Sequence, residues 1–221
     1  MDELNQISQT IALSMGAAWG SGINLYATVL MLGYLAYTGN IDLPPELMIV
    51  ADPLVMTAAG LMYAVEFFAD KIPGVDTFWD TLHTFVRIPA GAMLAASAIG
   101  DVGPAAEIAA ALVGGSLTAA THATKAGSRV LINTSPEPFS NWTASIAEDI
   151  AVFAGVWASI QHPAFFIVAI FLLILLMVWA LPKLWRGIKR VFKFLGRLFR
   201  WSDVDSDYSK PLENTKLPRP D

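Results

Sequence analysis

An uncharged run of eighteen residues, 164–181, constrains this chain more than any other feature of its sequence. It reads AFFIVAIFLLILLMVWAL. A helix of about 20 apolar residues crosses the ~30 Å hydrocarbon layer of a bilayer. Hydrophobic residues make up 55% of the 221-residue chain and charged residues only 15%, which excludes an ordinary soluble domain. The sequence therefore predicts an all-α integral membrane protein.

A second long uncharged segment, residues 10–38, contains four glycines and predicts either close helix packing or a local break. Shorter apolar runs between the two long segments are interpreted as helices completed by polar turns. The prediction is a polytopic transmembrane bundle with about six spans, near residues 10–38, 53–71, 77–100, 105–132, 141–160 and 164–182. Four full spans combined with broken or re-entrant helices are the alternative.

The positions of Lys and Arg predict which side of the membrane each loop faces. Loops 39–52, 101–107 and 161–163 contain no basic residue, whereas 71–77 and 125–140 do. Basic loops are retained in the cytoplasm. With six spans, this rule predicts that both termini are cytoplasmic, and we expect the protein in a bacterial inner (plasma) membrane.

Charge divides the chain into three parts. Residues 1–182, the predicted transmembrane domain, hold 14 acidic and 4 basic residues. Residues 183–200 hold 7 basic residues and no acidic one, at helical spacing beside an apolar face. This pattern predicts an amphipathic interfacial helix that binds anionic lipids, with a helix in a soluble bundle as the alternative. Residues 201–221 lack apolar periodicity and are predicted to be a disordered cytoplasmic tail. The net charge of -5 argues against nucleic acid as a partner.

Ionisable and amide side chains inside the predicted spans recur at intervals of three and four residues, which places them on shared helix faces. Such groups are costly at membrane depth and are functional candidates for that reason. The alternative is that they cap helices and form structural ion pairs. We predict a substrate or ion pathway formed by Asn24, Thr28, Glu66, Asp70, Lys71, Asp76, Asp80, His83, Arg87, His122, Lys125, Arg129, Asn133, Glu137, Asn141, Glu148 and Asp149.

Two parts of the chain share a weak internal sequence similarity. The segment NLYAT at 24–28 and the segment ATHAT at 120–124 each follow a Gly/Ser cluster and precede a proline-containing loop. With three spans in each half, 10–100 and 105–182, the halves would have opposite orientations, as in the 3+3 inverted repeats of many secondary transporters. Chance similarity in a Gly/Ala-rich sequence is the alternative.

Two longer motifs carry a family resemblance. The first is VEFFADKIPGVD at 65–76, followed by Trp79, Asp80, His83 and Arg87. The second is HATKAGSR at 122–129, followed by NTSPEP at 133–138, then Asn141, Glu148 and Asp149. Over residues 10–180 the chain resembles a bacterial membrane family known as domain of unknown function 4126. The resemblance implies a multi-spanning membrane protein and no particular activity.

The leading hypothesis is a small secondary transporter or flippase that moves an ion or a small charged or phosphate-bearing substrate. Carboxylates would bind protons or a cation, and the Lys and Arg side chains would hold an anionic group. No cofactor is required, although Asp76, Asp80 and His83 share one helix face and form a candidate divalent-metal site.

Two other classes of function remain as alternatives. One is an intramembrane lipid-modifying or hydrolytic enzyme, which no H-E-x-x-H, G-x-S-x-G or P-loop motif supports. The other is a non-catalytic scaffold locked by buried ion pairs. We predict no catalytic residue, and a homo-oligomer is left open.

Overall fold

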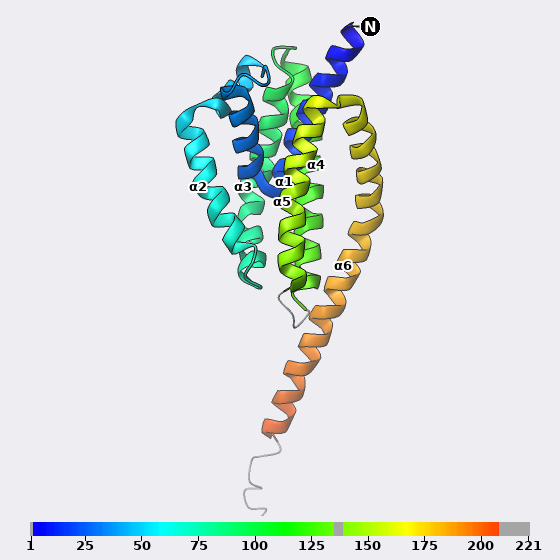
Figure 1. Ribbon diagram of the computed structural model, residues 1–221. Helices are drawn as coiled ribbons and strands as arrows, with labels where there is room; N and C mark the ends of the chain where they lie inside the picture. Colours follow the sequence, from blue (N-terminus) through cyan, green and yellow to red (C-terminus); the bar gives the residue numbers. More distant parts are fainter. Residues whose placement is uncertain (1, 135–138, 208–221) are drawn as a thin grey trace, which may run out of the picture.

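The computed structural model describes residues 2–134 and 139–207, and all regular structure within these ranges is helical (Figure 1). The prediction of an all-α bundle is confirmed. The elements are α1 (Asp2–Tyr37), a 3-10 helix η1 (Pro45–Ala51), α2 (Pro53–Ala69), α3 (Val75–Ala98), α4 (Pro104–Ile132), α5 (Phe139–Gln161) and α6 (Pro163–Asp207).

Helix α1 is a hairpin of two arms that meet at Asn24 (Figure 1). The backbone of Asn24, with φ -147° and ψ 100°, lies outside the helical region. A Cβ atom added at Gly20 would overlap Thr28, although eight residues along a straight helix span about 12 Å. Gln9 in the first arm and Asn40 after the second line one pocket. Both ends of α1 therefore lie at the same end of the bundle.

The prediction of one transmembrane span over residues 10–38 is therefore wrong, whereas the local break predicted there is present. The side chain of Asn24 stabilises the bend, because its Oδ1 accepts a hydrogen bond from the Ala27 amide at 2.9 Å. Thr28 Oγ1 donates to the Asn24 carbonyl at 2.9 Å. The second arm, residues 25–37, is about 20 Å long and too short to cross a bilayer.

The α1 hairpin occupies the centre of the bundle and packs against every other helix. Small residues let the backbones approach closely. A Cβ atom at Gly22 would lie 2.7 Å from the Thr118 carbonyl oxygen, and one at Gly33 would overlap the Val50 carbonyl. The glycines of this segment therefore permit the close helix packing that the sequence predicts.

Two helices are long and apolar enough to cross a membrane, namely α5 and the segment Pro163–Phe194 of α6. A third candidate span arises if η1 and α2, which are bent by 60°, are counted together. Helices α3 and α4 each bury charged side chains, including Arg87 and Lys125. These charged side chains lower the mean hydropathy of the two helices. Hydropathy and length thus support two or three spans in the described part of the chain.

The N-terminus and the described end of α6 lie at opposite ends of the bundle (Figure 1). The six predicted spans would place both ends on one side of a membrane, whereas the bundle has its two described ends on opposite sides. The difference arises from the α1 hairpin, whose two arms return to the same end. The inverted repeat would pair α1 with α4, but α1 is a hairpin and α4 is continuous.

Helix α6 is continuous from Pro163 to Asp207. The basic segment 183–200 therefore continues the last apolar helix along its axis, and the helix enters the first seven residues of segment 201–221. The remainder of that predicted tail, 208–221, lies outside the described residues.

Candidate functional site

Four carboxylates surround the ammonium of Lys125 where α2, α3, α4 and α5 meet. The Lys125 side chain is 3% exposed, and each of the four acids has an oxygen within 4 Å of its Nζ. The acids are Asp70 at 2.8 Å, Glu66 at 3.6 Å, Asp80 at 3.6 Å and Glu148 at 3.7 Å. Lys125 thus joins acids from three separate helical regions. We call these acids, together with Lys125, Arg87 and Arg129, the charge network.

Arg87 on α3 closes one side of the charge network. Its Nη2 donates to Glu66 Oε1 at 2.6 Å and its Nη1 to Asp80 Oδ1 at 2.9 Å, with all three side chains buried. Nη1 also lies 3.0 Å from His122 Nδ1. Because a guanidinium only donates, His122 Nδ1 is the acceptor and the imidazole proton is on Nε2. That Nε2 faces the Asp80 carbonyl oxygen at 3.1 Å.

Arg129 on α4 closes the other side. It forms a bidentate pair with Glu148, from Nε to Oε1 at 3.2 Å and from Nη2 to Oε2 at 2.5 Å. Its Nη1 donates to the Asp70 carbonyl at 3.2 Å and to Asn141, whose own Nδ2 donates to the same Asp70 carbonyl at 3.1 Å. The turn that follows α2 is thereby fixed to both α4 and α5.

The charge network has one carboxylate more than it has cations, so its formal charge is -1. Glu66, Asp70 and Asp80 each have a second carboxylate oxygen that is buried and has no hydrogen-bond partner among the described residues. An unpaired charge or polar atom away from water is costly. The arrangement can lower this cost by taking up one positive charge.

The tip of the α1 hairpin, residues 23–26, lies against the charge network. The Ile23 carbonyl accepts a hydrogen bond from Lys125 Nζ at 3.0 Å. Asn24 Nδ2 donates to Asp149 Oδ1 at 3.3 Å, so the tip contacts α4 and α5 at once. On the side of α3, the Tyr26 hydroxyl lies 3.0 Å from His83 Nε2.

Three other predicted residues lie at the turns beyond the network. Asn133 Nδ2 donates to both carboxylate oxygens of Asp76, at 2.8 and 3.0 Å, and so joins the end of α4 to the start of α3. Lys71 Nζ donates to Ser145 Oγ at 3.4 Å, and burial lowers the pKa of this amine, although the charge of Asp149 opposes that shift. Glu137 lies outside the described residues.

The three residues of the candidate metal site do not converge. Asp80 pairs with Arg87, Asp76 accepts from Asn133, and His83 bonds to Tyr26. Over 2–134 and 139–207, no group of three or more His, Asp or Glu side chains is placed to hold a metal ion. Asp76, Asp80 and His83 share one helix face, but each contacts a different partner.

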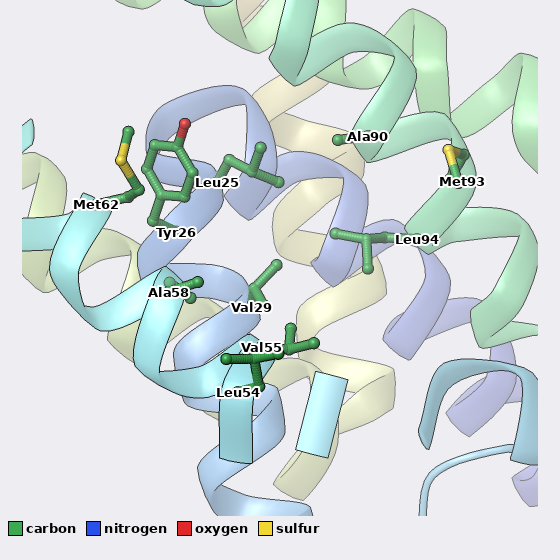
Figure 2. Close-up of a pocket in the computed structure, with 11 residues that line it drawn as sticks. Leu25, Tyr26, Val29, Leu54, Val55, Ala58, Met62, Ala90, Met93 and Leu94 are labelled. Atoms are coloured by element: carbon green, nitrogen blue, oxygen red, sulfur yellow. The ribbon is translucent and has the colours of Figure 1, made fainter. Parts of the chain in front are cut away.

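A groove of about 540 Å³ lies beside the hairpin tip, between α1, α2 and α3 (Figure 2). Its lining is apolar apart from Tyr26, and it contains no member of the charge network. Leu25 and Tyr26 of the tip line this groove, whereas Ile23 and Asn24 contact the network side. The lining residues are Leu25, Tyr26, Val29, Leu54, Val55, Ala58, Ala59, Met62, Ala90, Met93 and Leu94.

Sequence reasoning named every side chain of the charge network but missed two of its neighbours. Tyr26 is two residues from Asn24 and reads as an ordinary aromatic residue of an apolar segment, so no signal singled it out. The Ile23 carbonyl is a backbone group, freed by the bend, and no side-chain pattern could indicate it.

Comparison with known proteins identifies the family of this chain but not its activity. No curated protein and no solved structure matches this chain. The family described as "Domain of unknown function (DUF4126)" matches it over residues 11–183, which include all of the charge network. The chain therefore belongs to this family, as its two motifs indicated.

Proposed function

We propose that this chain is a small secondary transporter of the plasma membrane, in which the charge network binds the coupling ion, a proton or a small monovalent cation. One observation carries the proposal: the hairpin tip ends on a buried network that has one carboxylate in excess. Irregular backbone at membrane depth occurs where it is buried in protein or lines a cavity, and many secondary transporters bind ions at such helix breaks.

The proposed topology has five crossings, α2 to α6, with the α1 hairpin entering from the N-terminal side. The turn that contains Lys71 and the basic part of α6 lie at the same end of the bundle (Figure 1). The rule that basic residues stay inside assigns this end to the cytoplasm. The N-terminus and the acidic loops 39–52 and 101–107 would then face the opposite side.

The charges of the network favour a cation over an anion. Arg87, Lys125 and Arg129 are each already paired with a carboxylate. A phosphate or other anion would have to displace one of these acids, whereas a positive charge would balance the excess. The solute itself remains to be identified, and the apolar groove beside Tyr26 suits one with a hydrocarbon part.

The hairpin tip offers a route for coupling. Ile23 contacts the charge network and Asn24 contacts Asp149 beside it, while Leu25 and Tyr26 line the groove. A change in the charge of the network would alter the contact between Lys125 and the Ile23 carbonyl, and a shift of the tip would reshape the groove. Ion binding and solute binding would in this way act on the same four residues.

Purified protein in liposomes tests the proposal through currents evoked by jumps in proton, Na⁺ or K⁺ concentration. The wild type should respond to one of these ions. Glu66→Gln removes the negative charge of a fully buried network acid and should reduce the current at least about tenfold, since the network then has as many cations as carboxylates and no excess negative charge to attract the ion. Glu107→Gln changes an exposed acid on α4 and should leave the current unaltered.

A second function, that of a scaffold, is favoured by the pairing of every cation of the network with a carboxylate. Well-folded wild-type protein that gives no ion-evoked current under any of the three jumps would contradict transport and favour the scaffold. Helical circular dichroism on the same liposomes checks that each variant is folded.

A further inference from the structure

Another groove, of about 400 Å³, lies between α3, α4 and α6 and contains no residue of the hairpin tip. Its walls are largely apolar, with Ala123, Gly127 and Val130 from α4 and Leu184, Trp185 and Ile188 from α6. Gly127 gives the groove part of its width, because an added Cβ would come within 3.6 Å of Leu184. We call this the α6 groove. Its size and lining suit a hydrocarbon chain.

The α6 groove reaches the level at which α6 becomes basic. Trp185 is one of its walls, and the Lys189 ammonium lies 5.1 Å from the centroid of the Trp185 ring. Trp and Lys side chains gather where hydrocarbon meets headgroups. Lys189 therefore lies where the apolar groove meets the basic part of α6.

Within residues 2–134 and 139–207, no carboxylate neutralises the cations on this part of α6. Lys183, Arg186, Lys189, Arg190 and Lys193 form no ion pair within the described part of the chain, in contrast to every cation of the charge network. Beyond the groove, α6 projects past the ends of the other helices of the bundle (Figure 1). Unpaired basic groups beside the cytoplasmic ends of membrane helices attract anionic headgroups.

We propose that the α6 groove binds an anionic phospholipid, with an acyl chain between α4 and α6 and the phosphate held by Lys189. The charge of the cations selects the headgroup, and the apolar walls hold the chain. A neutral lipid would fill the groove but leave the cations unpaired. This site requires the chain to lie in a membrane and does not depend on transport.

Native mass spectrometry of the full chain, titrated with phosphatidylglycerol or phosphatidylcholine, tests the site. The wild type should retain phosphatidylglycerol at least about tenfold more tightly than phosphatidylcholine. The variant Lys189→Gln should lose most of this preference. The matched control Lys210→Gln removes the same charge from segment 201–221 and should keep it.

A second pair of variants tests the groove itself. Ala123→Trp places a large side chain in the groove at an exposed position and should weaken retention of phosphatidylglycerol, while Ala64→Trp, at an exposed position on α2, should not. Equal retention of the two lipids by the wild type would overturn the proposal. So would unchanged retention in Ala123→Trp, which would assign the lipid to the surface of α6, or a dimer that excludes lipid from the groove.

Discussion

At the scale of single residues, Lys125 matters most because it is the one cation in contact with all four acids of the charge network. Its removal would leave four carboxylates, of which Glu66, Asp70 and Asp80 are buried, with two arginines. A buried charge without a partner is far more destabilising than a missing surface pair. The residue at this position therefore sets the electrostatic balance of the whole site.

Lys125→Met should lower the free energy of unfolding by about 3–5 kcal/mol, because it leaves Asp70 and its neighbours uncompensated. Adding Asp70→Asn should restore part of the loss, since the acid nearest to the missing ammonium is then neutral. Thermal unfolding in detergent measures both. Lys71→Met, at a turn outside the network, should cost about 1 kcal/mol or less. A Lys125→Met protein as stable as Lys71→Met would contradict the role of Lys125.

Residue spacing predicted the members of the site better than it predicted their partners. The interval of three to four residues placed Asp80 and Arg87 on one helix face, and they do pair. The same interval suggested that Asp76 and His83 would join Asp80, but each contacts a different helix. Partners across helices depend on how the helices rotate and cross, which intervals within one helix do not specify.

At the scale of elements, most helix boundaries were predicted to within two residues. The predicted span 105–132 corresponds to Pro104–Ile132, and the predicted span 77–100 to Val75–Ala98. Proline and charged turns end these helices, and such signals are local in the sequence. Helix α1 is different, because its bend depends on contacts from Asn24 to α5 and on packing of its two arms within the bundle.

Asn24→Ala should loosen the hairpin tip, because it removes the cap to the Ala27 amide and the hydrogen bond to Asp149. Loss of such a cap costs about 0.5–2 kcal/mol. Hydrogen exchange measured by mass spectrometry should accelerate over residues 20–30 and little elsewhere. Asn40→Ala, in the exposed loop after α1, serves as the control. Faster exchange across the whole chain, or none at the tip, would argue against a local capping role.

At the scale of the whole molecule, the hairpin decides the topology. Because both of its ends lie at one end of the bundle, the five helices that follow leave the N-terminus and the end of α6 on opposite sides (Figure 1). The distribution of Lys and Arg fits this arrangement as well as it fits six spans. Loop charge alone could not distinguish the two, since no basic residue precedes Lys71.

Single cysteines can test this topology directly, because the natural chain has none. A membrane-impermeant maleimide should label Leu4→Cys from outside intact cells. It should label Lys193→Cys only from the cytoplasmic side, in inverted membrane vesicles. A third, at Asn40, should be labelled from the same side as Leu4, because both ends of the hairpin emerge together. Labelling of Leu4 and Lys193 from one side would restore six crossings and refute the hairpin.

The helical class, the positions of most helices and the set of polar residues that form the site can all be predicted from the amino-acid sequence. These properties follow from hydropathy, local turn signals and the cost of charge in an apolar segment, all of which are readable over a few turns of helix. The turn of α1 at Asn24 and the gathering of four acids around Lys125 emerge only in the folded chain. Those features depend on contacts between residues more than twenty positions apart, and the packing of the helices chooses among the pairings that local patterns allow equally.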